Sequence, residues 1–338
     1  MLVPRTAFTA TLLANGKVLM AGGQTSDIAD TPTAELFDPV TGTTSVAASM
    51  SVPRSGHTAT LLETGKVLVA GGISAPNSQV LASSELYDPV TNTWSRAAAM
   101  SHPRINHAAL RLKDGRVLAV GGSTASSPSD GPLDLEVYDP QADAWTSYRD
   151  DNRPNGVTAV LLSDGRVLIV GGWAVVGPRT AEFFDPAAGG GVVFGRFMVP
   201  YNRDWAAAAL LPDGGVIVAG GRTNGEQAGG ALNTTDLYEP GDTWIAGPAM
   251  RVGHCHNTLT TLANGVLLIA GGRCGAAESI AVAELYDPNA KMWAPATSLL
   301  DRVGFHSAVL LKDGRVLVAG GQTAGGVITA STEIYQAA

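Results

Sequence analysis

Residues 57–72 read HTATLLETGKVLVAGG, and this stretch indicates how the whole chain folds. It contains two short apolar segments, a polar turn around Gly65 and a closing diglycine at Gly71-Gly72. Apolar segments joined by a glycine-containing turn are typical of a tight β-hairpin, because glycine adopts the positive φ that the turn requires. The stretch therefore predicts two strands, at about 57–62 and 66–72.

The diglycine recurs along the chain at nearly constant intervals of 49, 50, 50, 49, 51 and 49 residues. A constant period of this length indicates a repeat protein. We therefore expect one domain over residues 1–338, although the length alone would suggest two or three. The seven copies are Gly22-Gly23, Gly71-Gly72, Gly121-Gly122, Gly171-Gly172, Gly220-Gly221, Gly271-Gly272 and Gly320-Gly321.

Two further strands are expected in each repeat. In the second repeat a third strand at 84–87 ends at Asp88-Pro89, because proline cannot donate to a strand ladder. A fourth strand is centred on Trp94. Tyr87, Trp94 and their counterparts in other repeats are expected to fill the space between neighbouring sheets.

These repeats resemble Kelch repeats. The resemblance rests on Pro-Arg-x-x-His before the first strand, Gly-Gly after the second, and Glu-x-Tyr-Asp-Pro followed by Thr-Trp in the third and fourth. It implies an all-β, seven-bladed β-propeller with four antiparallel strands per blade. The last repeat ends at Ala338 without a Thr-Trp strand, and residues 1–3 match only the tail of such a strand. Either the seventh blade has three strands, or residues upstream that would supply the fourth are missing.

Composition limits the classes of partner. The formal net charge is -8 and no run of Lys or Arg is present, so we expect no nucleic-acid partner. No apolar run reaches the roughly 18 residues of a membrane helix, so we expect no membrane partner. We further expect a monomer in the cytoplasm, or a secreted protein if a segment upstream is missing, with a small molecule or another protein as partner.

Several polar residues recur at fixed places in the repeat and are expected to be structural. His57, His107 and His306 share one place and are predicted to pack as consensus histidines. Arginines at a second place and acidic residues in the third strand are predicted to form braces between adjacent blades. These are Arg5, Arg54, Arg104 and Arg203, and Glu35, Glu85, Glu136, Glu182, Glu284 and Glu333.

Residues that break the repeat pattern are candidates for function, and they concentrate in repeats four to six. In a propeller, the connection into each blade and the loop after its second strand meet around the channel mouth. Two indoles, a tyrosine and several guanidinium groups are predicted to share one sector there. A platform of aromatic and arginine side chains suits a planar or anionic ligand. The predicted ligand-binding residues are Trp173, Tyr201, Arg203, Trp205, Arg222 and Arg273.

The sequence from His254 to His256 is the sharpest local feature. Folding the hairpin about Asn264 pairs residue 255 with about 273, which places Cys255 near Cys274. Three interpretations remain open: free or buried thiols, a cross-strand disulfide, and a Zn or Cu site that uses His254, His256 and one or both cysteines. Along a regular strand His254 and His256 would point the same way and Cys255 away from them.

Two functions are compatible with these residues. The first is a propeller that binds a small molecule or a protein on the face of repeats four to six. The second is an enzyme at the same mouth, an isomerase, cyclase or metal-assisted oxidoreductase, with His254 or His256 as acid or base and Asp204 orienting the proton. The Kelch family includes galactose-oxidase-like copper-radical enzymes with two tyrosines, two histidines and a cross-linked cysteine. This chain lacks that full set, since Phe305 precedes His306 and Tyr201 is the only tyrosine near such a connection.

Overall fold

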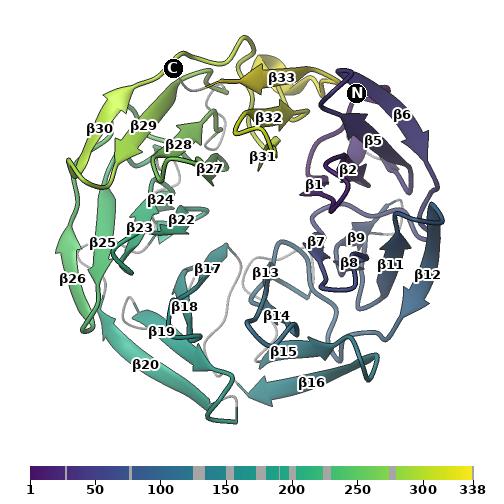
Figure 1. Cartoon of the computed structure of the whole chain (residues 1–338), viewed down its shortest axis with the longest axis horizontal. Coiled ribbons are helices and arrows are strands. Elements are labelled where there is room, and N and C mark those ends of the chain that lie inside the picture. The colour runs from purple at the N-terminus through teal and green to yellow at the C-terminus, as the bar shows by residue number, and fades with distance from the viewer. Residues whose placement is uncertain are drawn as a thin grey trace.

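A computed structural model gives the structure of the chain and describes residues 1–26, 29–75, 78–124, 134–149, 156–172, 180–189, 191–197, 203–223, 230–273 and 279–336. Over these ranges it contains six four-stranded antiparallel sheets and one three-stranded sheet. The sheets are arranged as blades in a ring, each with its first strand nearest the axis (Figure 1). The prediction of a seven-bladed propeller with a three-stranded last blade is confirmed.

The strands of each blade follow one another outward in chain order. The first three blades are β1 (Thr9–Leu12), β2 (Val18–Ala21), β5 (Ala34–Asp38) and β6 (Thr43–Ala47); β7 (Thr58–Leu61), β8 (Val67–Ala70), β11 (Ser84–Asp88) and β12 (Thr93–Ala97); and β13 (Ala108–Arg111), β14 (Val117–Val120), β15 (Asp134–Asp139) and β16 (Ala144–Arg149).

The next four blades repeat this order. They are β17 (Val157–Leu161), β18 (Val167–Gly171), β19 (Thr180–Asp185) and β20 (Gly191–Phe197); β22 (Ala207–Leu210), β23 (Val216–Ala219), β25 (Thr235–Glu239) and β26 (Thr243–Ala246); β27 (Thr258–Thr261), β28 (Leu267–Ala270), β29 (Ala283–Asp287) and β30 (Met292–Pro295); and β31 (Ser307–Leu310), β32 (Val316–Ala319) and β33 (Thr332–Tyr335).

Short elements lie at the loop ends of the blades. They are the pairs β3 (Gln24–Ser26) with β4 (Ala29–Asp30), β9 (Ile73–Ser74) with β10 (Gln79–Val80), and β21 (Arg203–Asp204) with β24 (Arg222–Thr223), and the 3₁₀ helix η1 (Ala324–Gly326). No helix in the described ranges has the length and apolar character needed to cross a bilayer.

The hydrophobic core lies between blades. The second strand of every blade is almost entirely buried, because it has a strand on each side and a neighbouring blade on each face. In the second blade the predicted aromatic pair is present, with the Tyr87 and Trp94 ring centroids 5.0 Å apart. The Trp94 indole N–H donates to Ala48 O of the first blade over 2.8 Å. The tryptophan of the fourth strand therefore lies between neighbouring blades, as predicted.

The diglycines allow the backbones of neighbouring blades to approach closely. Gly72 N donates to Arg104 O over 2.9 Å, and equivalent bonds recur at other blade junctions. A Cβ added to Gly71 would lie 2.5 Å from Arg104 O, and its φ is +66°. Both the contact and the conformation exclude a larger side chain at this position.

The ring closes between blades seven and one without an outer strand in blade seven. The Met1 ammonium group donates to Ala330 O over 3.0 Å, and Gly321 N donates to Arg5 O over 2.9 Å. Leu2 N and Val3 N donate to the Glu35 carboxylate over 2.7 and 3.0 Å. Residues 1–3 thus occupy the place that follows an outer strand in other blades.

Candidate functional site

One residue in each repeat has a left-handed backbone just before the first strand of the blade. These seven residues, which we call the mouth ring, follow the spacing of the diglycines. Left-handed non-glycine residues are uncommon and are enriched at functional sites. The mouth ring comprises Ala7 (φ 51°), Gly56 (φ 60°), Asn106 (φ 55°), Gly156 (φ 81°), Trp205 (φ 56°), His256 (φ 46°) and Phe305 (φ 55°).

Backbone hydrogen bonds join neighbouring members of the mouth ring across blade boundaries. Gly56 N donates to Ala7 O over 2.9 Å, and Asn106 N donates to Gly56 O over 2.9 Å. The series continues across the closure, where Ala7 N donates to Phe305 O over 3.3 Å. At these junctions the backbone N–H and C=O groups pair with each other, so the side chains of the ring set the chemical character of the channel mouth.

A cavity of about 420 Å³ opens on the outer side of the mouth ring. Its wall is completed by residues that directly follow the diglycines, which pair with the residues before the mouth ring. This volume is in the range of small-molecule sites. The lining comprises Thr6, Ala7, Gln24, Ser55, Gly56, Ile73, Ile105, Asn106, Ser123, Trp205, His256, Phe305 and Gln322.

One side of the cavity is an aromatic wall. The His256 imidazole lies between two rings, with centroids 4.4 Å from Trp205 and 4.2 Å from Phe305. Across the mouth ring, blades one, two and four carry only Ala7, Gly56 and Gly156. The three stacked rings therefore form a flat surface on one side of the mouth ring. The small residues on the other side leave space next to it.

Polar groups complete the cavity. Within the described part of the chain, no hydrogen bond is formed by the Asn106 amide or the His256 ring nitrogens, although both residues line the cavity. Burial, together with the nearby positive charges of Arg222 and Arg273, lowers the pKa of His256 to about 3. The imidazole is therefore neutral near pH 7, with one nitrogen able to donate and the other able to accept.

Two arginines flank the aromatic wall in different ways. Arg222 Nε donates to both Asp204 carboxylate oxygens, over 3.0 and 3.1 Å, so this pair is charge-compensated. Burial of Asp204 raises its pKa, and Arg222 partly offsets that effect. Arg273 instead donates to the neutral amide oxygen of Gln322 over 2.7 Å. Among the described residues, Arg273 forms no ion pair with a carboxylate.

Arg203 lies outside the cavity, in a structural brace. It is 1% exposed, donates to Gly220 O over 2.8 Å and pairs with Asp236 over 2.7 Å. Arg5, Arg54 and Arg104 make the same two kinds of contact, with Glu35, Glu85 and Glu136. The predicted braces are present, but each one joins the connecting segment to the blade that it enters rather than joining two adjacent blades.

His254 occupies the brace position of blade six. Its Nδ1 lies 2.8 Å from Gly271 O and its Nε2 lies 3.4 Å from Glu284 Oε1, so both nitrogens face acceptors as the arginines do. Burial alone would raise the pKa of Glu284, but hydrogen bonds from His254 and two backbone N–H groups lower it overall. His254 is fully buried and does not line the cavity.

The expectation that His254 and His256 point the same way is wrong. Residues 254–256 are not a strand, and the left-handed backbone at His256 turns its ring into the mouth while His254 points into the blade. The predicted pairing of 255 with 273 is confirmed, because Arg273 N donates to Cys255 O over 2.8 Å.

Cys255 is disulfide-bonded, and a disulfide sulfur offers no thiolate to a metal. The other cysteine of the chain, Cys274, lies outside the described residues. Among the described side chains, one group of three potential metal ligands lies close together, and it includes neither His254 nor His256. The residues described around His254 and His256 therefore do not support a Zn or Cu site there.

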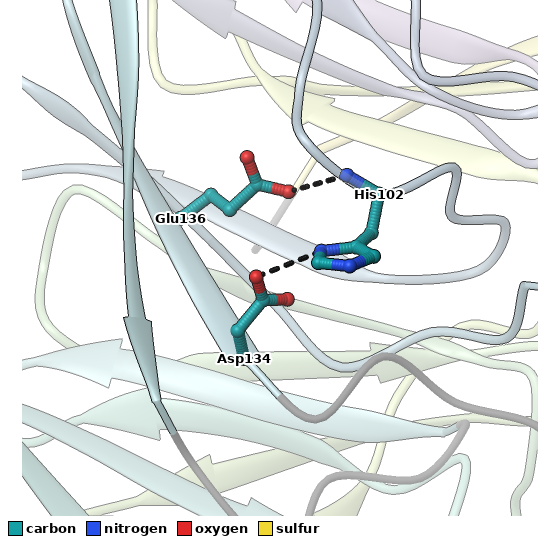
Figure 2. Close-up of side chains that lie close together, drawn as sticks. All are labelled: His102, Asp134 and Glu136. Carbon is teal, nitrogen blue, oxygen red and sulfur yellow. Dashed lines mark hydrogen bonds and ion pairs between the residues drawn. The ribbon is translucent and has the colours of Figure 1, made fainter.

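One group of potential metal ligands does occur, on blade three. His102 Nδ1 lies 2.9 Å from Asp134 Oδ2, and the backbone N of His102 donates to Glu136 over 3.2 Å (Figure 2). Arg104, which is fully buried, donates to Asp134 over 3.0 Å and to Glu136 over 2.8 Å. The single Arg104 guanidinium group already hydrogen-bonds to both carboxylates, so we interpret the group as an extended brace.

The consensus histidines are structural, as predicted. His57, His107 and His306 are 5–7% exposed. The Nε2 of each hydrogen-bonds with a threonine hydroxyl in the preceding blade, over 3.1, 2.9 and 3.0 Å. Burial lowers the pKa of His57 to about 3 and that of His306 to about 4.

The structure brings together only part of the predicted site. Trp205 and His256 line the cavity, and Arg222, Arg273 and Asp204 lie beside it, whereas Arg203 and His254 serve as braces. Trp173, Tyr201 and Cys274 fall outside the described residues. Asn106, Phe305, Gln24 and Gln322 also line the cavity but are not among the predicted site residues. An alignment of the residue two places after each brace position identifies the whole mouth ring.

The residues described do not fit a copper-radical centre. Five tyrosines of the described chain are buried within or between blades, and no tyrosine lines the cavity; they are Tyr87, Tyr138, Tyr238, Tyr286 and Tyr335. Cys255 is engaged in a disulfide and so is not available for a thioether cross-link to tyrosine. We therefore derive no copper chemistry for this mouth.

Comparisons with known proteins agree with the architecture. A family model described as the Kelch motif matches residues 53–101. Galactose oxidase from Gibberella zeae is 26% identical over 137 residues, which are 38% of this chain and 19% of that protein. The chain thus matches only about a fifth of the length of that curated relative.

Two solved structures have similar folds. A fungal alcohol oxidase of the AA5 family in complex with copper superposes with a TM-score of 0.77 and 16% identity, over 95% of this chain and 71% of its own. A protein designated YjhT superposes with a TM-score of 0.64 and 14% identity, over 98% of this chain and 94% of its own. At these identities the likeness concerns the fold alone. The chain is therefore a seven-bladed β-propeller with a Kelch motif over residues 53–101, and its fold is similar to that of the fungal alcohol oxidase.

Proposed function

We propose that this propeller binds a compact anionic small molecule in the cavity at its mouth ring. The observation that carries the proposal is the stack of Trp205, His256 and Phe305 along one wall of a cavity of about 420 Å³. A stacked aromatic wall offers a flat apolar surface to the face of a ring-shaped ligand. The opposite side, with Ala7 and Gly56, leaves space for that ligand.

Polar groups favour a ligand with hydrogen-bonding substituents. The Asn106 amide and the His256 nitrogens are unpartnered among the described residues, and Ser123 and Gln24 lie in the same wall. A ligand that pairs with these groups gains directional hydrogen bonds, because they face the cavity without internal partners.

The charge at the rim favours an anion. Arg273 is held by the neutral Gln322 amide, while the Asp204 carboxylate is engaged by Arg222. A carboxylate that approaches Arg273 would form a charge-assisted hydrogen bond without displacing an internal carboxylate. The imidazole of His256 is neutral and so adds no charge of its own to the site. Its lowered pKa reflects burial and the nearby positive charges of Arg222 and Arg273.

Isothermal titration with 2-naphthoate and its neutral analogue 2-naphthamide tests this proposal. At roughly 0.3 kcal/mol per non-hydrogen atom, the expected Kd of 2-naphthoate is about 1 mM or tighter. We expect 2-naphthamide to bind at least about 5-fold more weakly, and Arg273→Gln to remove this difference.

Trp205→Ala locates the site. It should weaken 2-naphthoate binding by at least about 5-fold, the scale of an aromatic anchor, while Trp205→Phe, which copies Phe305, retains most of the affinity. No binding of 2-naphthoate to the wild type, or equal binding by Trp205→Ala, would contradict the proposal.

A further inference from the structure

A second cavity lies one residue deeper along the channel. It has a volume of about 290 Å³ and shares six lining residues with the outer cavity, all of them members of the mouth ring. The remaining lining comes from residues that directly follow the ring, at the start of the innermost strands: Phe8, His57, His107, Val157, Asn257 and His306. The mouth ring is therefore the boundary between the two cavities.

The deeper cavity has a different chemistry from the outer one. Among the described residues that line it, none is Lys, Arg, Asp or Glu. Its consensus histidines are held neutral: burial lowers the pKa of His57 to about 3, that of His306 to about 4 and that of His107 well below 6.5. The Nε2 of each is already bonded to a threonine of the neighbouring blade. An uncharged group is therefore compatible with this cavity, whereas a charged one would lose hydration without gaining a counter-ion.

The mouth ring is asymmetric, so the two cavities can connect on one side. Trp205, His256 and Phe305 fill the ring in blades five to seven, and each has an aromatic neighbour. Ala7 and Gly56 line both cavities in blades one and two and project little or no side chain. The small-residue side is where a ligand substituent would pass.

We propose that the deeper cavity receives an uncharged substituent of the same ligand whose anionic ring lies in the outer cavity. This inference rests on the proposed function, because it extends that ligand through the mouth ring. It assigns the two cavities as subsites for two parts of one molecule, the outer for the charged ring and the deeper for a neutral tail.

The repeats supply the variants that test this inference. Val157 lines the deeper cavity but not the outer one, and blade one carries Phe8 at the equivalent position. Val157→Phe therefore enlarges a lining side chain of the deeper cavity, with a residue that the fold accommodates in blade one. Val157→Ala, which copies Ala206, is the matched control that leaves the cavity open.

Two probes separate the subsites: 2-naphthoate and 6-butoxy-2-naphthoate, which adds a neutral tail opposite the carboxylate. Each buried methylene strengthens binding about 4-fold. The tailed probe should therefore bind the wild type and Val157→Ala at least about 10-fold more tightly than 2-naphthoate. In Val157→Phe this advantage should disappear while the affinity for 2-naphthoate is unchanged.

The outcomes distinguish this inference from the proposed function. Binding of 2-naphthoate with no advantage for the tail, or an advantage that persists in Val157→Phe, overturns the deeper subsite and leaves the outer one intact. Failure of both probes to bind the wild type contradicts both. If Val157→Phe does not fold, Asn257→Phe, which also copies Phe8 and changes a residue that lines the deeper cavity alone, must remove the advantage of the tail.

Discussion

The imidazole of His256 lies against the indole of Trp205, with 4.4 Å between the ring centroids. The two residues come from neighbouring blades, and both have a left-handed backbone just before the first strand. The repeat geometry that spaces the blades therefore also stacks these side chains. A backbone position shared by all seven blades therefore places these residues at the channel mouth.

Binding of 2-naphthoate should be nearly independent of pH between 6 and 8. Burial and two arginines lower the pKa of His256 to about 3, so its charge does not change in this interval. An imidazole with an ordinary pKa near 6.5 would instead make anion binding stronger as the pH falls. Titration calorimetry at pH 6, 7 and 8 measures this directly, and a several-fold increase in affinity at pH 6 would mean that His256 titrates there.

His254→Ala should lower the free energy of unfolding by about 2–4 kcal/mol, because it leaves the buried Glu284 carboxylate without its side-chain partner. His254→Arg restores the residue that four other blades carry and should cost less. Urea unfolding followed by circular dichroism provides both values. Folded His254→Ala should bind 2-naphthoate like the wild type, and a selective loss of binding without a loss of stability would place His254 in the site.

Gly71→Ala should destabilise the protein strongly, and Gly65→Ala only modestly. A Cβ at Gly71 would lie 2.5 Å from Arg104 O, whereas nothing lies within 4 Å of the Cβ position at Gly65. Both glycines have positive φ, so the conformational cost of about 1 kcal/mol is common to the two variants. The difference between the thermal unfolding midpoints of the two variants therefore measures the cost of the close contact between Gly71 and Arg104 O. Equal midpoints would show that this contact is unimportant.

Stability should decrease as the pH falls below about 6.5. The unfolded chain takes up protons on His57 and His306 near pH 6.5, while the folded protein does so only near pH 3 and 4, respectively. The unfolded state therefore binds more protons between these limits, and the free energy of unfolding falls with decreasing pH there. His57→Asn, which copies Asn257, should reduce the number of protons taken up on unfolding by up to one. The free energy of unfolding should then depend less steeply on pH. An unchanged slope would contradict the depressed pKa of His57.

The architecture could be predicted from the sequence because it is repeated. The diglycines at a constant spacing, the Gly65 turn and the Tyr87–Trp94 pair each encode a local geometry, and seven copies in phase remove the ambiguity of any single motif. Even the pairing of Cys255 with Arg273 followed from counting along one hairpin. The three-stranded last blade followed from the absence of a Thr-Trp strand after Tyr335.

The site was harder to predict because its residues meet only through the ring. Asn106 and Phe305 are 199 positions apart in the sequence and line one cavity because both occupy the mouth ring. His254 departs from the repeat pattern, and such a departure predicts a functional role. In the structure it makes the contacts of the arginines that occupy this position in other blades. The direction of His256 depended on a left-handed backbone, which a regular strand pattern does not reveal.

A crystal structure of the protein soaked with 2-naphthoate would locate the bound ligand. We expect the naphthalene ring to lie on the wall formed by Trp205, His256 and Phe305, with its carboxylate toward Arg273. A probe bound at another site, with the mouth ring empty, would contradict the assignment of the mouth as the ligand-binding site.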